Sequence, residues 1–97
     1  MTNVPRESAV IRAIEKWFKK QPMTKVCKHW GNQLGEKRPD LNGSYMGRHI
    51  EIEVKRPGGK ATKAQQKMID DWLAAGAIAG TVTSVEELEA LIKEQTQ

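Results

Sequence analysis

The chain has 97 residues, which is enough for one small domain with a buried core. Sixteen Lys and Arg residues against twelve Asp and Glu give a formal charge of +4, which favours a polyanionic partner without requiring one. No apolar run is long enough to cross a bilayer, and a hydrophobic content of 38% suits a soluble protein. The N-terminus lacks the apolar segment of a signal peptide, and the single Cys27 cannot form an internal disulfide. We therefore expect a cytoplasmic protein.

A first helix is predicted over residues 5–20, where apolar side chains recur at helical spacing. The apolar stripe contains Val10, Ile11, Ile14, Trp17 and Phe18. Glu7 falls on the same stripe, whereas Glu15 lies roughly 100° around the helix from Ile14 and points away. A carboxylate on the core side near a helix N-terminus is either a partner of the helix dipole or a site residue. From this helix alone, the dipole interpretation is favoured.

A strand is predicted over residues 24–30, and a loop follows over residues 31–38. Cys27 and His29 could form one pair of metal ligands, but the sequence has no second pair, so Cys27 is interpreted as a small core side chain rather than part of a zinc site. The loop ends with the cations Lys37 and Arg38. Such a loop is suited to contact with phosphate, although a solvated loop is the usual meaning of such a run.

A β-hairpin is predicted next, with strands over residues 40–45 and 48–55. A tight turn at residues 46–47 is preferred because it lets the longer strand pair along its length. An earlier turn at residues 42–43 would shorten the hairpin. In the preferred register Asp40, at the start of one strand, lies close to Glu53, near the end of the other.

The second strand of the hairpin alternates apolar and polar residues, as expected for a strand with one face in a core. Its apolar residues are Ile50, Ile52 and Val54. Glu53 and Lys55 share the polar face at the end of the strand. A carboxylate and an amine held together could bind a divalent metal and orient a water molecule. For an isolated pair, a solvated face with a salt bridge is the usual interpretation, but Asp40 beside Glu53 favours a site.

The last third of the chain predicts two helices separated by a strand. Thr62 and Gln65 form a capping box that begins a helix ending near residue 75, and an apolar strand follows over residues 77–83. Ser84 begins the final helix with a second capping box. The order α-β-β-β-α-β-α predicts an α/β fold in which helices flank a mixed sheet.

The order and spacing of these residues resemble the PD-(D/E)XK nuclease superfamily. The residues that match its pattern are Glu7, Pro39, Asp40, Glu53, Val54, Lys55 and Gln65. Within the superfamily the chain is most similar to VRR-NUC domains, specifically the small stand-alone ones of phages and bacteria. The resemblance implies a single restriction-endonuclease-like domain over residues 1–97, acting in a bacterial or phage-infected bacterial cell.

The resemblance also implies a catalytic role for these residues. Asp40, Glu53 and the backbone carbonyl of Val54 would bind Mg²⁺ or Mn²⁺, and Glu7 would supply a further carboxylate directly or through water. Lys55 would hold the attacking water and offset the charge that develops on phosphorus. Gln65 would help to order the site, a role compatible with its place in the capping box.

DNA is the substrate that the resemblance implies, cleaved by a homodimer that suits branched DNA such as a four-way junction. The expected phosphate-contacting cations are Lys37, Arg38, Arg48, Arg56, Lys60 and Lys63. Two other interpretations stay open at this point. The chain could be a non-catalytic nucleic-acid-binding module with a nuclease-like fold, or a basic α/β interaction protein without a metal site.

Overall fold

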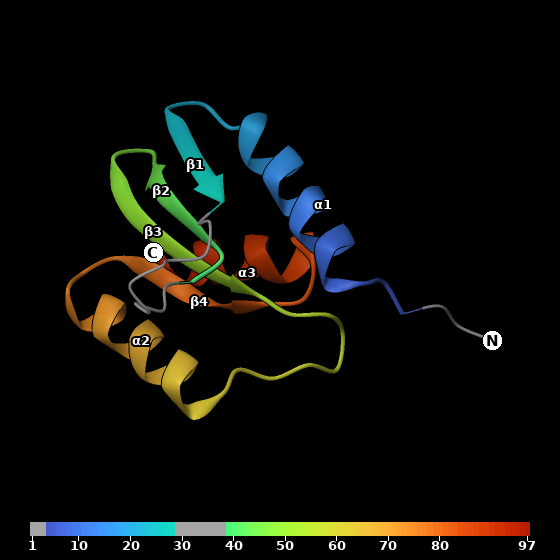
Figure 1. The fold of residues 1–97 in the computed structure, drawn as a ribbon. Helices are drawn as coiled ribbons and strands as arrows, with labels where there is room; N and C mark the ends of the chain where they lie inside the picture. Colours follow the sequence, from blue (N-terminus) through green and yellow to red (C-terminus); the bar gives the residue numbers. More distant parts are fainter. Residues whose placement is uncertain (1–3, 29–38) are drawn as a thin grey trace.

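A mixed sheet with the strand order β1-β2-β3-β4 forms the centre of the fold (Figure 1). The strands are β1 (Thr24–Lys28), β2 (Leu41–Tyr45), β3 (Arg48–Val54) and β4 (Ile78–Val82). β2 pairs antiparallel with both β1 and β3, whereas β3 and β4 are parallel. The structure is a computed structural model and describes residues 4–28 and 39–97.

Three helices in the described residues flank this sheet: α1 (Glu7–Lys19), α2 (Lys63–Ala74) and α3 (Val85–Gln95). α1 packs against α3, β1 and β3, and α3 also packs against β4 (Figure 1). α2 packs against β3 and β4 on the opposite face. The order α-β-β-β-α-β-α is therefore confirmed. No helix in the described parts of the chain is long and apolar enough to cross a bilayer.

The main core lies between the sheet and the layer formed by α1 and α3. Its buried members are Val10, Ile11, Ile14, Phe18, Leu41, Ile50, Ile52, Val54, Ile78, Val82, Leu88 and Ile92. The predicted alternation in β3 is confirmed, because Ile50, Ile52 and Val54 all belong to this core. The residues between them consequently face α2, and this is how β3 presents polar groups on its other side.

A tight turn at the predicted position reverses the chain between β2 and β3. Met46 and Gly47 have φ angles of 49° and 86°, which are the values of a two-residue turn whose twist matches the flanking strands. The earlier turn is wrong, because Gly43 lies inside β2 opposite Ile50. A Cβ at Gly43 would lie 2.0 Å from the carbonyl oxygen of Lys25, so only glycine allows β1 to approach this closely.

The burial of Cys27 differs from its prediction, and α2 buries few of its side chains. Cys27 is exposed rather than buried, since it lies on β1 at the edge of the sheet and faces the side on which α2 covers only β3 and β4. In α2 only Ile69 is buried, whereas Ala64 and Leu73 are exposed. The reason is that α2 lies over a sheet face that carries charged groups as well as apolar ones.

Candidate metal and nuclease site

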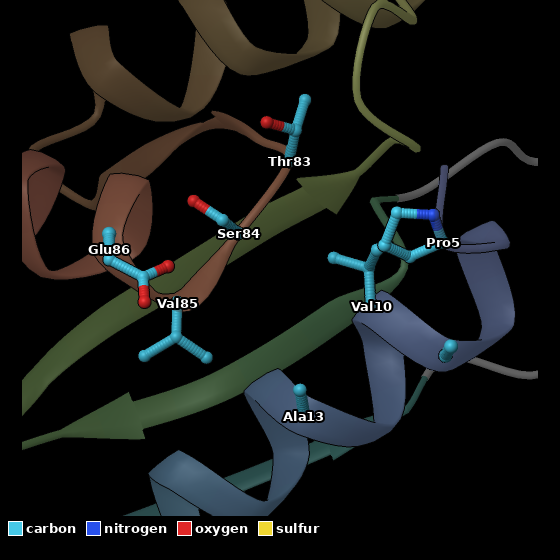
Figure 2. A pocket seen from close by; sticks show the side chains of 8 residues that line it. Pro5, Val10, Ala13, Thr83, Ser84, Val85 and Glu86 are labelled. Atoms are coloured by element: carbon cyan, nitrogen blue, oxygen red, sulfur yellow. The ribbon is translucent and has the colours of Figure 1, made fainter. Parts of the chain in front are cut away.

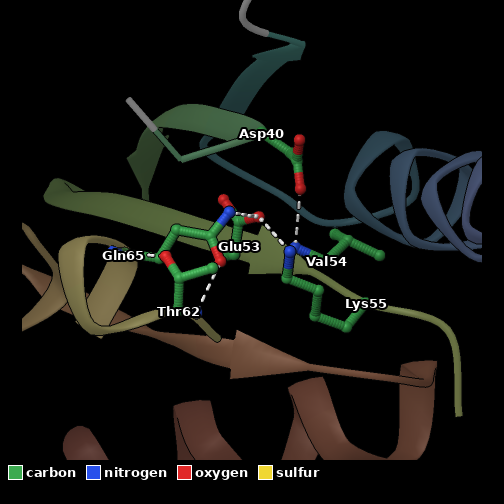
Figure 3. A network of polar contacts seen from close by, with 6 residues as sticks. All are labelled: Asp40, Glu53, Val54, Lys55, Thr62 and Gln65. Atoms are coloured by element: carbon green, nitrogen blue, oxygen red, sulfur yellow. Dashed lines mark hydrogen bonds and ion pairs between the residues drawn. The ribbon is translucent and has the colours of Figure 1, made fainter. Parts of the chain in front are cut away.

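The predicted site residues other than Glu7 gather at the carboxyl end of β3, near the starts of β2 and α2 (Figure 3). Asp40 immediately precedes β2. Because Leu41 pairs with Ile52, Asp40 lies opposite Glu53, as the sequence predicted. Lys55 follows β3 directly, and Gln65 reaches the same point from the first turn of α2. Three separate elements therefore supply side chains to one small volume.

Asp40 is held against the end of β3 by the backbone. Its Oδ2 accepts a hydrogen bond from the N–H of Val54 at 2.8 Å. The N–H of Lys55 donates to the Val82 carbonyl of β4. Because the backbone groups of successive residues point to opposite sides of a strand, the N–H and carbonyl of Val54 point towards Asp40. Pro39 has no N–H, so it cannot donate a further hydrogen bond between β2 and β3 to the Val54 carbonyl. That carbonyl is thus directed to the same side as the Asp40 carboxylate.

Glu53 is the centre of the cluster and is only 6% exposed. Its Oε2 accepts a hydrogen bond from Gln65 Nε2 at 3.1 Å and lies 3.5 Å from Lys55 Nζ. Burial raises the pKa of Glu53 from its ordinary value of 4.5 to about 7. The Asp40 charge adds to this rise, and the Lys55 ammonium opposes it. Glu53 thus holds its proton close to neutral pH, next to the carboxylate of Asp40.

The oxygen atoms of this cluster fit a hard divalent cation. A cation between Asp40 and Glu53 would offset both the burial of Glu53 and the repulsion by Asp40, which together raise the Glu53 pKa, and the Val54 carbonyl adds a third oxygen. Residues 4–28 and 39–97 contain no group of three or more His, Cys, Asp and Glu side chains placed to hold a metal. Two carboxylates suffice for Mg²⁺, because this ion usually keeps several of its waters.

Gln65 serves the helix cap and the site at once. Its backbone N–H donates to Thr62 Oγ1, its Oε1 accepts from the Thr62 N–H, and its Nε2 donates to Glu53. The predicted capping box is therefore confirmed, and the same side chain contacts the candidate metal ligand. The two interpretations that the sequence left open are compatible in one geometry.

Glu7 differs from its predicted place on the core side. It is exposed, and it does not join Asp40 and Glu53 in a group of three carboxylates within the described chain. Its helical angle matches the apolar stripe, but it opens α1 one turn before Val10, Ile11 and Ile14 reach the core. Glu15, predicted to face solvent, is partly buried. The role of Glu7 as a further carboxylate of the metal site stays a prediction.

A comparison of Glu7→Gln with Glu15→Gln tests that role. We expect Glu7→Gln to lower the cleavage rate more than tenfold, since a carboxylate that acts through water still contributes to the site. Glu15→Gln serves as the matched control on the same helix and should change the rate by less than twofold. Equal effects in a metal-saturated cleavage assay would remove Glu7 from the site.

The predicted DNA-contacting cations fall into three groups. Arg56, Lys60 and Lys63 are exposed on the connection from β3 to α2 and its first turn, adjacent to the site. Arg48 lies at the opposite end of β3 and donates to the carbonyls of Gly76 and Gln95 at 3.1 and 2.7 Å. It therefore links β3 to the ends of α2 and α3, and its predicted contact with phosphate stays a prediction.

The remaining two predicted cations, Lys37 and Arg38, lie outside the described residues. Of the predicted cations close to the site in sequence, Arg56, Lys60 and Lys63 thus lie in the described chain.

A second buried carboxylate on the same face of β3 was missed by sequence reasoning. Glu51 is fully buried, and its Oε2 lies 2.6 Å from His49 Nε2. The His49 ring stacks on Trp72 of α2 with 4.6 Å between ring centroids. The His-x-Glu spacing on one strand face was the available signal, since residues two apart lie side by side. This contact fastens the far end of α2 to β3.

A cavity of about 330 Å³ opens between the start of α1 and the start of α3 (Figure 2). Its lining consists of Pro5, Ala9, Val10, Ala13, Thr83, Ser84, Val85 and Glu86. These side chains are mostly apolar, and Glu86 is the one charged group among them. They include none of the predicted site residues, so the chemistry-bearing groups lie in the β3 cluster instead.

Comparisons of this chain with family models, with curated proteins and with solved structures found no match. Any function assigned to it therefore depends on the residues and geometry described above.

Proposed function

We propose that this chain is a metal-dependent DNA endonuclease with a PD-(D/E)XK core, similar to the small VRR-NUC nucleases. One observation carries the proposal. The Asp40 carboxylate, the Lys55 ammonium and the Gln65 amide converge on Glu53, a buried acid whose pKa is raised to about 7. A salt bridge on a solvated strand face would not need a second carboxylate or a buried one.

Each group has a role that follows from its position. Asp40, Glu53 and the Val54 carbonyl would hold Mg²⁺ or Mn²⁺, which supplies charge neutralisation and a water of lowered pKa when bound. Lys55, beside Glu53 Oε2, is placed to hold the attacking water and to offset negative charge on the phosphate. Gln65 keeps the Glu53 carboxylate in position. The backbone of β3 fixes the spacing of Glu53 and Lys55.

DNA is the proposed substrate because exposed cations lie on the segment that joins the end of β3 to the start of α2. Arg56, Lys60 and Lys63 are exposed there, and the chain carries a formal charge of +4. Such cations contact phosphate oxygens without reading bases. Selectivity for DNA structure is therefore proposed, with branched DNA such as a four-way junction as the substrate.

Lys55→Ala tests the catalytic role directly. We expect this variant to bind Mg²⁺ but to cleave roughly 10²- to 10⁴-fold more slowly, because a positioned proton-transfer group contributes that much. The assay compares duplex, flap and four-way-junction DNA at saturating Mg²⁺. Lys67→Ala is the matched control, since Lys67 is exposed and lies 3.4 Å from Asp71 on α2, away from Glu53.

The outcomes of this assay separate the candidate functions. DNA binding without Mg²⁺-dependent cleavage by the wild-type chain would indicate a non-catalytic binding module. Equal cleavage by Lys55→Ala and Lys67→Ala would remove Lys55 from the reaction.

A homodimer is the proposed assembly, because one site cuts one strand and a four-way junction needs two related cuts. Exposed apolar side chains available for an interface include Met23, Met46 and Leu73. We expect light scattering to give twice the chain mass at micromolar concentration, and junction cleavage to yield paired nicks. A monomer at that concentration would contradict the paired-site scheme, as would a preference for linear duplex.

A further inference from the structure

We infer that Thr62 is a positioning residue of the Glu53 site, because the cap that it forms on α2 aims the Gln65 amide at Glu53. Thr62 is exposed and has no contact with Glu53 in the described chain, so it acts only through Gln65. This role deepens the proposed function and depends on it for its catalytic meaning. The helix cap becomes part of the site.

The contacts form a continuous path from the cap to the carboxylate (Figure 3). Thr62 Oγ1 accepts from the Gln65 N–H at 3.1 Å, and the Thr62 N–H donates to Gln65 Oε1 at 2.9 Å. The other end of the same amide, Nε2, donates to Glu53 Oε2 at 3.1 Å. One side chain therefore makes contacts at both ends, and neither end can rotate without breaking a hydrogen bond.

The cap also decides which end of the Gln65 amide faces Glu53. A backbone N–H can only donate, so the amide oxygen must face Thr62. The amide NH₂ is then left on the side of Glu53, where a carboxylate needs a donor. Turning the amide over would place two donors together at the cap and two acceptors together at the site. The capping box thus selects the orientation that the site requires.

The choice of oxygen on Glu53 follows from the same geometry. Gln65 Nε2 and Lys55 Nζ both approach Oε2, at 3.1 and 3.5 Å. The second carboxylate oxygen carries neither of these contacts, and it is the one left to serve as a ligand. Loss of the cap would free the Gln65 side chain and let the Glu53 carboxylate rotate. Ligand orientation of this kind is worth about 10- to 100-fold in metal affinity at other sites.

The chain provides a matched control for the loss of a cap. Ser84 caps α3, and its Oγ accepts from the Glu87 N–H at 3.0 Å. The Glu87 side chain turns to Thr83, with hydrogen bonds of 2.7 and 2.8 Å, and not to the site. Ser84→Ala should therefore weaken a helix start by a similar amount without moving Gln65. Any effect shared by the two alanine variants reports on helix capping alone.

The experiment uses the full chain and four variants: Thr62→Ala, Thr62→Ser, Gln65→Ala and Ser84→Ala. Two measurements need no activity: the NMR signals of the Gln65 side-chain amide in the metal-free protein, and Mn²⁺ affinity by titration calorimetry. Thr62→Ala is expected to shift the amide signals and to lower Mn²⁺ affinity about tenfold. Thr62→Ser should restore both, and Ser84→Ala should change neither by more than twofold.

A double variant makes the test specific to the path through Gln65. Combining Thr62→Ala with Gln65→Ala should lower Mn²⁺ affinity no further than Gln65→Ala alone, because the cap acts through that one side chain. Additive losses would overturn the inference, and so would a Thr62→Ala variant that behaves like Ser84→Ala. A wild-type chain that neither binds Mn²⁺ nor cleaves DNA would overturn the proposed function and the catalytic role of Thr62 together. The amide signals would still show whether the cap holds Gln65 against Glu53.

Discussion

Replacing either carboxylate of the candidate metal site, in Asp40→Ala or Glu53→Ala, is expected to lower DNA cleavage by roughly 10³-fold or more. A bound metal contributes several kcal/mol to phosphodiester hydrolysis, and about 4 kcal/mol corresponds to that factor. The fold should persist, because removing one of two adjacent carboxylates relieves repulsion in the metal-free protein. Cleavage of junction DNA at saturating Mg²⁺ and circular dichroism measure the two effects.

Asp70→Ala is the control for this prediction, since Asp70 is an exposed carboxylate of α2 that accepts a hydrogen bond from Gln66. It should cleave like the wild-type chain. Titration calorimetry with the Asp40→Ala, Glu53→Ala double variant tests the ligands themselves. Unchanged Mg²⁺ or Mn²⁺ binding by that variant would show that the ligand assignment is wrong.

The local patterns of the sequence were sufficient to predict the element order and the hairpin register. Strand alternation and a tight turn act over neighbouring residues, so the partner of Glu53 could be predicted from the length of the hairpin alone. The capping box at Thr62 is likewise a contact within one helical turn, and the structure confirms it. These features place Asp40, Glu53 and Gln65 correctly because each depends on few residues.

The predictions that failed depend on where elements end relative to one another. Glu7 has the helical angle of the core stripe, yet its side chain is exposed because α1 begins before its core contacts do. The phosphate contact predicted for Arg48 stays a prediction, and the length of β3 separates this residue from Lys55. Helical and strand periodicity give the direction of a side chain but not what lies opposite it. Such placement is a tertiary property and needs the structure.

The pH dependence of stability should show the buried state of Glu53 in the metal-free protein. Its pKa is about 7 in the folded chain, against an ordinary value of 4.5, so the folded state holds a proton that the unfolded state has released. The resulting stabilisation is complete below pH 4.5 and is lost as the pH rises through 7. The linked change in the free energy of unfolding is about 3 kcal/mol.

Glu53→Gln should remove this dependence, because the amide keeps the shape of the side chain and carries no ionisable proton. At pH 8 and without metal, we expect the variant to be more stable than the wild-type chain by up to about 3 kcal/mol, or more than about 10 °C in Tm. Near pH 4.5 the two should be similar. Urea unfolding across this range measures both, with the exposed Glu89→Gln as control. Added Mg²⁺ should stabilise only the wild-type chain, which reverses the order at pH 8 when the metal is far above its Kd. Parallel stability curves for the wild-type and Glu53→Gln chains would contradict the assignment of Glu53 as a buried carboxyl group with a raised pKa.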